Sequence, residues 1–460
     1  MRITLIKPNI GRKEHNLYVD EARMEPLQLG VLAALTPRDI DVVLYDDRME
    51  KIPFDEPTNL AAITVETFTA RRSYEISAEY ARRGVPVLMG GMHARLLPEE
   101  VKKYCTSIMI GDAEDKWAVM IEDLRKGQLK KEYICAAVPV PQKGVLTRRD
   151  IFENKGYLPL TLLQFSRGCR FSCNYCASSV YFNKTHFCRE VGEVIAEIKS
   201  QKRKDLFFVD DNITANREKA KELFRALIPL KLRWVSQASI DMLEDQELME
   251  LMVKSGCLGH VIGFESIREE SIKTMGKGVN KSYVANKYEQ AIAELRKWGL
   301  QTWAAFTVGH DTDTVESIIE TYKFAIRNKF CFAAYNILMP YPGTQLHEDL
   351  KAQKRLLYEG QWWLHSDYRF NHAAFIPKNM SADELTKVSF LCRTKTNSLA
   401  AIIYRAFDFK TNMRNPLRFV TYCIYNPLFR KETFKKQGLI LGLNEAQGVK
   451  DGTARKSNCS

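Results

Sequence analysis

Short apolar segments alternate with helix-like segments over most of the chain, and this alternation limits the folds open to it. Within residues 1–135 the expected strands are 3–6, 41–45, 61–65, 86–89 and 107–110, and the expected helices are 27–35, 70–82, 98–103 and 116–126. Strands that alternate with helices are typical of an open parallel sheet covered by helices on both faces. The sequence therefore predicts an α/β fold that begins with a doubly wound parallel sheet.

Three glycines directly follow two of these strands: Gly90, Gly91 and Gly111. Ligands of doubly wound sheets bind beyond the carboxyl ends of the strands. A glycine there lets the backbone approach a ligand closely, but it also serves an ordinary tight turn. Both interpretations, a ligand-binding edge and plain turn glycines, remain open at this point.

The alternation resumes after residues 136–160, whose prolines and glycines predict a linker. From 161 to 345 the expected strands are 161–165, 206–209, 234–238, 260–264, 302–308 and 334–339, with helices between them. Six strand–helix units predict a partial (β/α)6 barrel of the TIM type, with its active site at the C-terminal ends of the strands. For residues 346–460 the pattern predicts a helical, basic C-terminal extension.

The chain has 11 cysteines, an odd number that excludes complete pairing in disulfides. Lys7 and Pro8 interrupt the first apolar stretch, so no signal peptide is expected, and no apolar run is long enough to span a membrane. We therefore expect a cytoplasmic protein with reduced thiols. Closely spaced cysteines in such a protein hold metal or take part in chemistry.

Cys169, Cys173 and Cys176 have the spacing C-x3-C-x2-C and directly follow the first strand of the predicted barrel. Three thiolates on one short loop can hold three corners of an iron–sulfur cube and leave the fourth iron open to a substrate. A structural zinc site would need a fourth ligand, for which His186 is a candidate, and usually has two C-x2–4-C pairs. A disulfide or a chance group of core cysteines fits a polar loop in a reducing compartment less well. We favour the iron–sulfur cluster and expect the other cysteines to be core or surface residues, with Cys188, nearest the loop, as the one to test.

With Tyr175 before its last cysteine, this motif resembles the signature of the radical S-adenosylmethionine (SAM) superfamily. The resemblance implies that Cys169, Cys173 and Cys176 bind a [4Fe–4S] cluster, and that SAM chelates its open iron through the amino and carboxylate groups. It also implies that an electron, supplied by a donor such as flavodoxin or ferredoxin, cleaves SAM to methionine and a 5′-deoxyadenosyl radical. That radical takes a hydrogen atom from an unactivated carbon.

Later strand ends resemble the positions where this family contacts SAM. Asp210, Asp211 and Asn212 close the second strand and Glu265 closes a later one, and the resemblance implies that they bind SAM. A carboxylate suits the SAM ammonium group through charge-assisted hydrogen bonds. The alternative for Asp210 and Asp211 is an ordinary helix cap. Residues 339–344 resemble the element that packs on adenine, with a proline turn as the alternative.

Residues 25–30, 90–94 and 110–114 resemble the cobalamin-binding domain of one class of radical SAM enzymes, which includes radical methyltransferases and an anaerobic oxidative cyclase. The resemblance covers nearly all of residues 1–345. It implies that Gly90, Gly91 and His93 contact a cobalamin that lies between the sheet edge and the cluster. The chain lacks the D-x-H-x-x-G motif that supplies a cobalt ligand in some cobalamin domains. His93 could in principle ligate cobalt, but a histidine in such a glycine turn more often contacts the edge of a ligand or the backbone. We therefore disfavour His93 as the cobalt ligand.

The resemblance implies an enzyme that functionalises an inert carbon of a small molecule, most directly by cobalamin-dependent methyl transfer. The alternative is a radical SAM oxidoreductase or cyclase that transfers no methyl group. A tRNA methylthiotransferase-like enzyme is remote, because it needs a second cysteine triad and residues 1–150 contain only Cys105 and Cys135. A corrinoid sensor or binding module that is not an enzyme is also disfavoured, because it would not need a cluster with an open iron.

The basic charge of the chain is concentrated near its C-terminus. Lys and Arg outnumber Asp and Glu by 68 to 56, and residues 401–460 contain 11 of the cations and four of the acids, so this region holds +7 of the net +12. One interpretation is a helical cap with a solvated basic face. A second is peripheral contact with an anionic membrane, together with an apolar or lipid-like substrate. Nucleic-acid binding is the least favoured.

Overall fold

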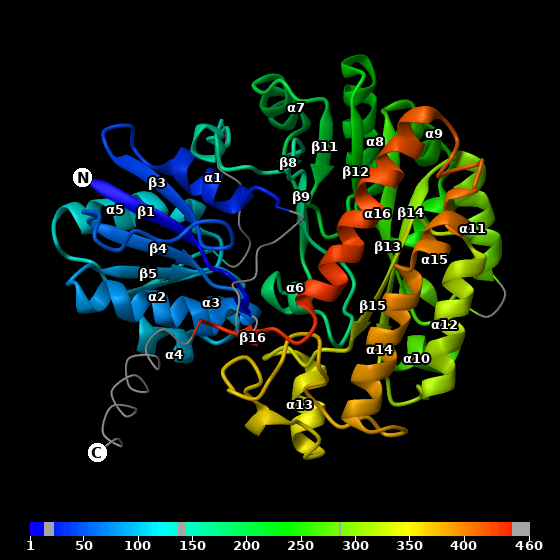
Figure 1. The fold of residues 1–460 in the computed structure, drawn as a ribbon. Helices are drawn as coiled ribbons and strands as arrows, with labels where there is room; N and C mark the ends of the chain where they lie inside the picture. The colour runs from blue at the N-terminus through cyan, green and yellow to red at the C-terminus, as the bar shows by residue number, and fades with distance from the viewer. Residues whose placement is uncertain (13–22, 137–143, 285–286, 444–460) are drawn as a thin grey trace, which may run out of the picture.

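Two six-stranded parallel sheets lie side by side in the computed structural model, which describes residues 1–12, 23–136, 144–284 and 287–443 (Figure 1). The N-terminal sheet and its helices are blue to cyan in Figure 1, and the second sheet is green to yellow. The architecture is therefore α/β with parallel sheets, as the alternation of apolar segments predicts.

The first sheet has the strand order β3-β1-β4-β5-β6-β7. Its strands are β1 Arg2–Lys7, β3 Asp41–Asp46, β4 Leu60–Thr64, β5 Val87–Gly90, β6 Ser107–Ile110 and β7 Glu132–Ile134, and its helices are α1 Leu27–Leu35, α2 Ala70–Arg82, α3 Met92–Leu96, α4 Pro98–Val101 and α5 Trp117–Arg125. Successive residues of β4 alternate between two core clusters: Leu60 and Ala62 belong to one, Ala61 and Ile63 to the other. Both faces of the sheet are thus buried, which explains why its strands are nearly continuous apolar runs.

The second sheet has the strand order β15-β14-β13-β12-β11-β8, so neighbours along the chain are neighbours in the sheet. Its strands are β8 Thr161–Leu163, β11 Asp205–Phe208, β12 Arg233–Ala238, β13 Cys257–Glu265, β14 Gln301–Val308 and β15 Phe332–Ile337, and the helices between them are α7 Val191–Lys199, α8 Arg217–Leu227, α9 Gln246–Lys254, α10 Glu269–Thr274, α11 Lys287–Trp298 and α12 Val315–Arg327. One large core cluster joins strands and helices, with Trp234, Phe264 and Phe306 among its fully buried members. All parallel strands end at one edge, so residues that follow them gather there.

The C-terminal region is helical only in part, which differs from the predicted extension. Helices α13 Gln345–Ala352, α14 Ala382–Thr396, α15 Leu399–Ala406 and α16 Pro416–Lys436 are present, but the stretch between α13 and α14 is mostly irregular. It buries Trp362, Trp363 and Tyr368 in a core cluster of the first sheet. Strand β16 Ile440–Leu441 then pairs with β2 Gly11–Arg12 near the N-terminus. Periodicity misses this stretch because its order comes from buried aromatic side chains.

The expected linker also contributes to a core. A short 3-10 helix, Asp150–Phe152, places Ile151 and Phe152 in a core cluster of the first sheet.

Among the described residues, no helix is long and apolar enough to cross a membrane.

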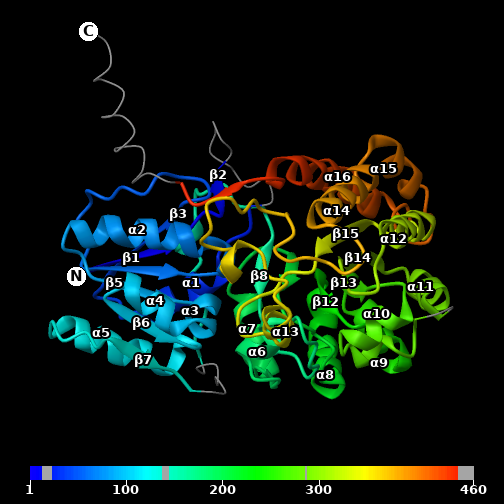
Figure 2. The ribbon, with the colours of Figure 1, turned by 90° about the horizontal axis from the view of Figure 1, so that it is seen from below.

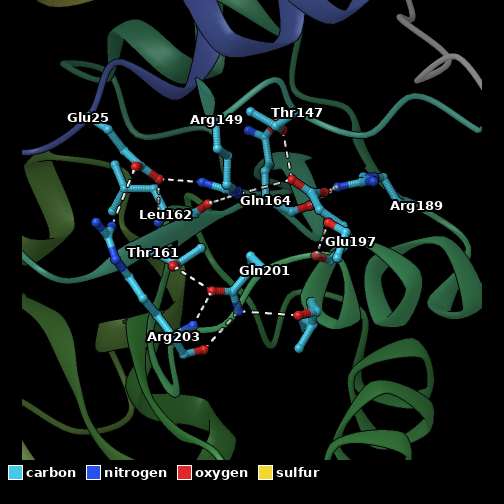
Figure 3. A network of polar contacts seen from close by, with 12 residues as sticks. Glu25, Thr147, Arg149, Thr161, Leu162, Gln164, Arg189, Glu197, Gln201 and Arg203 are labelled. Carbon is cyan, nitrogen blue, oxygen red and sulfur yellow. Dashed lines mark hydrogen bonds and ion pairs between the residues drawn. The ribbon is translucent and has the colours of Figure 1, made fainter. Parts of the chain in front are cut away.

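Arg149, from the same segment, connects the two sheets through buried carboxylates (Figure 3). It forms an ion pair with Glu25, which precedes α1, and its Nη2 lies 3.2 Å from Glu197 on α7. Glu25 also accepts the backbone N–H of Leu162 at 3.1 Å, and Glu197 accepts Arg189 at 2.7 Å. Both carboxylates are almost fully buried, so their charges depend on these partners.

Arg149→Ala should lower the free energy of unfolding by about 3 kcal/mol, because it removes one shared partner from two buried carboxylates. The neighbouring Arg148→Ala is the matched control, since Arg148 pairs with Asp150, whose side chain is 57% exposed. The free energy of unfolding of Arg148→Ala should fall by only about 1 kcal/mol or less. Urea unfolding of both variants measures the difference, and equal losses would contradict the role of Arg149.

Candidate active site

A small antiparallel hairpin carries the cysteine loop, residues 169–176. Its strands are β9 Ser166–Gly168 and β10 His186–Cys188, with Gly168 opposite His186. Gly168 has φ +79°, and a Cβ atom there would lie 2.2 Å from the carbonyl oxygen of Thr185. Only glycine fits this position, which turns the chain directly into Cys169.

The cysteine loop brings Cys169, Cys173 and Cys176 together, all partly exposed. Burial raises the pKa of the Cys173 thiol to about 11, which Lys277 opposes and the nearby Cys176 and Cys169 reinforce. Among the residues that the structure describes, no three His, Cys, Asp or Glu side chains are gathered tightly enough to share a single ion. The cysteines form a loose triad on one loop.

Two further elements fix the position of the cysteine loop. The N–H of Asn174 donates to the carbonyl oxygen of Met275, after α10, at 3.1 Å. The carbonyl oxygen of Asn174 accepts the N–H of Leu346, on α13, at 3.0 Å. The loop is therefore attached to its surroundings near its centre as well as at the hairpin.

Asp210 does not face an open site, which differs from the prediction that it contacts SAM. It is fully buried, and its carboxylate accepts the hydroxyl of Ser166 at 2.5 Å, the N–H of Ser166, and the N–H of Phe165 at 3.1 Å. These bonds occupy both oxygen atoms. Asp210 therefore holds the base of the hairpin that carries the cysteine loop.

The other two residues of this group also have local partners. Asp211 accepts the N–H of Gly168 at 3.1 Å and remains partly exposed. Asn212 is buried; its amide donates to Ser239 at 2.9 Å, and its oxygen accepts Thr214 in a tight turn. Of the three, only Asp211 keeps an exposed carboxylate beside the cysteine loop.

The burial of Asp210 predicts a specific pH dependence of stability. Burial raises the pKa of Asp210 to about 7, although its hydrogen bonds from Ser166 and Phe165 oppose the rise. The unfolded value is about 3.9, so between these pH values the folded state binds more protons and stability falls as the pH increases. Urea unfolding at about pH 5 and about pH 8 should show this loss in the wild type and a smaller one in Asp210→Asn. Equal pH slopes in the two proteins would contradict the account.

Glu265 lies at the end of β13 and forms a buried ion pair with Lys277. Lys277 Nζ is 2.5 Å from Glu265 Oε1 and donates to the Gly263 carbonyl at 2.9 Å, while Thr307 donates to Oε2 at 2.5 Å. Burial alone would raise the pKa of Glu265, but Lys277 and Thr307 lower it below its usual value. Both side chains are at least 87% buried, and Cys173 and Cys176 lie near enough to raise the pKa of Lys277.

Sequence reasoning singles out Glu265 but misses Lys277. The lysine follows α10 between two glycines, Gly276 and Gly278, and nothing in that pattern points to Glu265. Tyr175, by contrast, lies where the motif predicts, beside Glu265 and two of the cysteines, and burial followed by Glu265 raises its pKa. The charged centre of the site is therefore a carboxylate, an ammonium group and a phenol next to the cysteine triad.

A cleft opens between the edge of the first sheet and the segments that flank the cysteine loop. It contains about 1040 Å³ of empty space, counting the part that is open to solvent. One wall comes from the first sheet and α1, including Gln28, Gly90, Gly91 and Gly111, and the other includes Gln164, Arg167, Tyr181, Phe182 and Val209. The lining is mostly apolar, as in most small-molecule sites.

The glycines of this wall leave no room for side chains. Gly91 has φ +106°, and a Cβ atom there would lie 2.9 Å from the carbonyl oxygen of Val65. Gly111 has φ +105° and approaches Cys135. These contacts are with the chain's own atoms, so the turns by themselves require glycine at Gly91 and Gly111. The role of Gly90, Gly91 and Gly111 as a ligand-binding edge stays a prediction.

Charged side chains link the two walls of the cleft. Arg167 Nη1 lies 2.8 Å from Asp112 and Nη2 lies 2.6 Å from Glu114, both just after β6. The hydroxyl of Tyr181 donates to Asp112 at 2.6 Å, and Arg95 donates to the Tyr181 carbonyl at 2.8 Å. Arg167 and Tyr181 were not predicted, because their partners lie more than 50 residues away.

His93 does not line the cleft, which differs from its prediction as a cofactor contact. Its ring is fully buried under α3, with Nε2 3.0 Å from Glu100 and Nδ1 3.3 Å from Thr67. Glu100 also accepts Tyr74 at 2.7 Å and Trp363 at 3.1 Å. His93 thus belongs to a buried polar group that joins the first sheet to the C-terminal region.

The sequence and fold of the chain match known proteins. The family model described as the radical SAM superfamily matches residues 163–325, which include the cysteine loop, Glu265 and Lys277. The chain is 29% identical over 396 residues to a bacteriochlorophyllide d C-12(1)-methyltransferase of Chlorobaculum tepidum, covering 83% of this chain and 84% of that protein.

Two solved structures share the fold. One is the radical SAM methyltransferase TsrM from Kitasatospora setae, with a TM-score of 0.60, 17% identity, and coverage of 76% of this chain and 75% of that chain. The other is the cobalamin-dependent SAM radical enzyme OxsB, with a TM-score of 0.67, 12% identity, and coverage of 94% and 71%. Residues 163–325 therefore match the radical SAM superfamily, and most of the chain is similar in sequence to a methyltransferase.

Proposed function

We propose that the chain is a cobalamin-dependent radical SAM methyltransferase that acts on an unactivated carbon of an apolar small molecule. The observation that carries this proposal is the cleft, because one wall is the glycine edge of the first sheet and the other belongs to the segments beside the cysteine loop. A corrinoid in the cleft and a cluster on the loop would therefore be neighbours. The relatives named methyltransferase and cobalamin-dependent support this assignment.

In this proposal Cys169, Cys173 and Cys176 bind the [4Fe–4S] cluster, and Gly90, Gly91 and Gly111 line the corrinoid site. When bound, the cluster supplies the electron that cleaves SAM, and the corrinoid supplies a methyl carrier. The cleft fits such a group because its lining is mostly apolar and includes three glycines, which have no side chains. None of the described residues that line the cleft is a histidine.

The buried pair of Glu265 and Lys277 is proposed to hold the amino-acid part of SAM. SAM carries an ammonium and a carboxylate, and in this proposal its binding exchanges the ion pair of Glu265 and Lys277 for contacts with these two groups beside Cys173. Tyr175 donates to Glu265 and keeps its carboxylate in place. Asp211 is a partly exposed carboxylate at the hairpin. These residues bind and orient SAM and leave the space toward the first sheet for the substrate.

A reducing partner such as flavodoxin or ferredoxin is proposed to supply the electron. The cysteine loop is half-buried and Arg170 at its start has a half-exposed side chain, so the loop is accessible from outside. The substrate is proposed to be an apolar small molecule, because the cleft walls are mostly apolar. A bacteriochlorophyllide, named as a substrate of the Chlorobaculum relative, is the first acceptor to test.

The experiment is anaerobic turnover with SAM that carries a deuterated methyl group, a chemical reductant and a panel of apolar acceptors. Methyl transfer predicts S-adenosylhomocysteine, 5′-deoxyadenosine and an acceptor heavier by the labelled methyl group. The protein prepared without corrinoid is the control and should form no S-adenosylhomocysteine. Formation of 5′-deoxyadenosine with an oxidised or cyclised acceptor and no labelled product would overturn methyl transfer and leave the oxidoreductase alternative.

A further inference from the structure

Helices α15 and α16 and the segments next to them expose many large apolar side chains. Ten of the seventeen large apolar side chains that are exposed among the described residues lie between 391 and 434. Leu399, Ile403 and Phe407 recur every four residues, so they lie on one side of α15 and its continuation. On α16, Leu417, Val420 and Ile424 have the spacing of one helix face. We call the six residues just named the outer face, together with four further exposed residues: Leu391, Tyr404, Phe409 and Phe434.

The two helices lie side by side at one edge of the molecule (Figure 2). Tyr422 of α16 donates to the carbonyl oxygen of Ile402 in α15 at 2.7 Å. The apolar rows of the two helices therefore belong to one body, and the outer face extends over both.

The inner side of these helices combines a small apolar cluster with buried arginines, which is unusual for a surface helix. Arg405 is 1% exposed and donates to the carbonyl oxygens of Phe330 and Cys331 at 2.9 and 2.6 Å. Arg418 is also buried and donates to the carbonyl oxygen of Leu258 at 2.7 Å. A chain that buries arginine while exposing isoleucine and phenylalanine departs from the usual distribution, and such exposed apolar surface marks an interaction site.

The charge around the outer face has one sign. Residues 391–436, all of which the structure describes, contain ten Lys or Arg and two acids. Both acids are buried and paired, Asp408 with Arg296 at 3.0 Å and Glu432 with Lys436 at 2.9 Å. Lys395, Lys410, Arg414 and Lys431 are exposed. The face is therefore apolar with cations among and around the apolar side chains.

We propose that the outer face of α15 and α16 binds the surface of an anionic lipid bilayer. Apolar side chains enter the boundary between headgroups and acyl chains while neighbouring cations contact anionic headgroups. A second copy of the chain is a poorer occupant, because two such faces would bring cations against cations. Binding at the surface needs no spanning helix, and it does not depend on the chemistry proposed for the active site.

The first experiment is co-sedimentation of the full chain with vesicles of phosphatidylcholine and phosphatidylglycerol, in comparison with pure phosphatidylcholine. The test variant is Ile403→Ser/Val420→Ser/Ile424→Ser, whose side chains are 59%, 52% and 59% exposed. The control is Val119→Ser/Ile134→Ser/Ile376→Ser, which removes the same side-chain types at 43%, 60% and 45% exposure. The test variant should bind anionic vesicles about tenfold more weakly or worse, and the control should bind like the wild type.

The second experiment reverses charge at matched positions. Lys410→Glu/Lys431→Glu, at the outer face, should weaken binding to anionic vesicles and reduce its dependence on salt. Lys51→Glu/Lys103→Glu changes the net charge equally at exposed positions on the first domain and should leave binding unchanged. Equal losses in the two variants would show a response to net charge alone and overturn the proposal.

A third measurement does not depend on how well the triple variants fold. Phe409, 72% exposed, is replaced by Trp, and its fluorescence should shift to the blue on addition of anionic vesicles. Vesicle binding without that shift would place the contact elsewhere. Absence of vesicle binding, together with a dimer in sedimentation equilibrium that Ile403→Ser/Val420→Ser/Ile424→Ser dissociates, would assign the face to a second copy and overturn the proposal.

Discussion

Replacing Cys173 by Ala is expected to reduce SAM cleavage to the background of the uncatalysed reaction. The cysteine loop offers three thiolates, one for each of three irons of the cluster. A cluster whose fourth iron has no protein ligand needs all three thiolates to stay bound to the chain. Loss of one ligand removes the cluster and the electron path together. The measurement is 5′-deoxyadenosine formed by anaerobically reconstituted protein, with iron and sulfide content determined on the same sample.

Cys188→Ala is the matched control for that experiment. Cys188 is also partly exposed and lies on β10, in the same hairpin, but it packs against the core of the second sheet. Its iron content and SAM cleavage should equal those of the wild type. If Cys173→Ala still cleaved SAM, the cysteine loop would not be the cluster site. If Cys188→Ala lost iron, Cys188 would have to be counted among the cluster ligands.

Lys277→Met is expected to destabilise the protein and to abolish SAM binding. It leaves Glu265 buried without its cation, which costs about 3 kcal/mol or more. Glu265→Gln/Lys277→Met removes both charges and should recover much of that stability, because an uncompensated buried charge is no longer present. Urea unfolding measures the first effect, and equilibrium binding of SAM to reconstituted protein measures the second.

The double variant separates stability from ligand binding. If Lys277 and Glu265 hold SAM, Glu265→Gln/Lys277→Met stays folded and still fails to bind it. Lys273→Met is the control, because Lys273 lies four residues earlier with a side chain that is 59% exposed, and its loss should cost about 1 kcal/mol or less. SAM binding by the folded double variant at wild-type strength would show that the pair is only structural.

The strands could be predicted because both sheets bury apolar runs between turn residues. The first five strands of the N-terminal sheet and the six of the second sheet are present where the pattern places them. Strand β7 Glu132–Ile134 was missed because it is short and only Tyr133 is buried. The hairpin of β9 and β10 was missed because its sequence reads as part of the cysteine loop.

The candidate site could be predicted at the level of positions but less well at the level of roles. Asp210 lies at the strand end as expected, yet two backbone N–H groups and a hydroxyl already satisfy it. Those donors come from residues more than 40 positions away, so no local pattern reveals them. Lys277 and Arg167 escaped notice for the same reason, since a lysine or arginine in a loop is ordinary until the fold supplies its carboxylate.

The basic C-terminal region shows the same limit in another form. Its cations were expected to lie on the solvated side of the helices, as in most amphipathic segments. Instead Arg405 and Arg418 point inward to backbone carbonyls, and ten large apolar side chains between 391 and 434 are exposed. Helical periodicity identifies two faces, but the partners on each face depend on the rest of the fold.

The proposed methyl transfer depends most on the binding of a corrinoid in the cleft, next to the cluster. The direct test is the visible absorption spectrum of wild-type protein purified without oxygen from cells supplied with cobalamin, with iron and cobalt measured on the same sample. The account predicts the bands of an iron–sulfur cluster and of a corrinoid together, with one cobalt for each cluster. Cluster bands without cobalt, even after incubation of the protein with hydroxocobalamin, would contradict it.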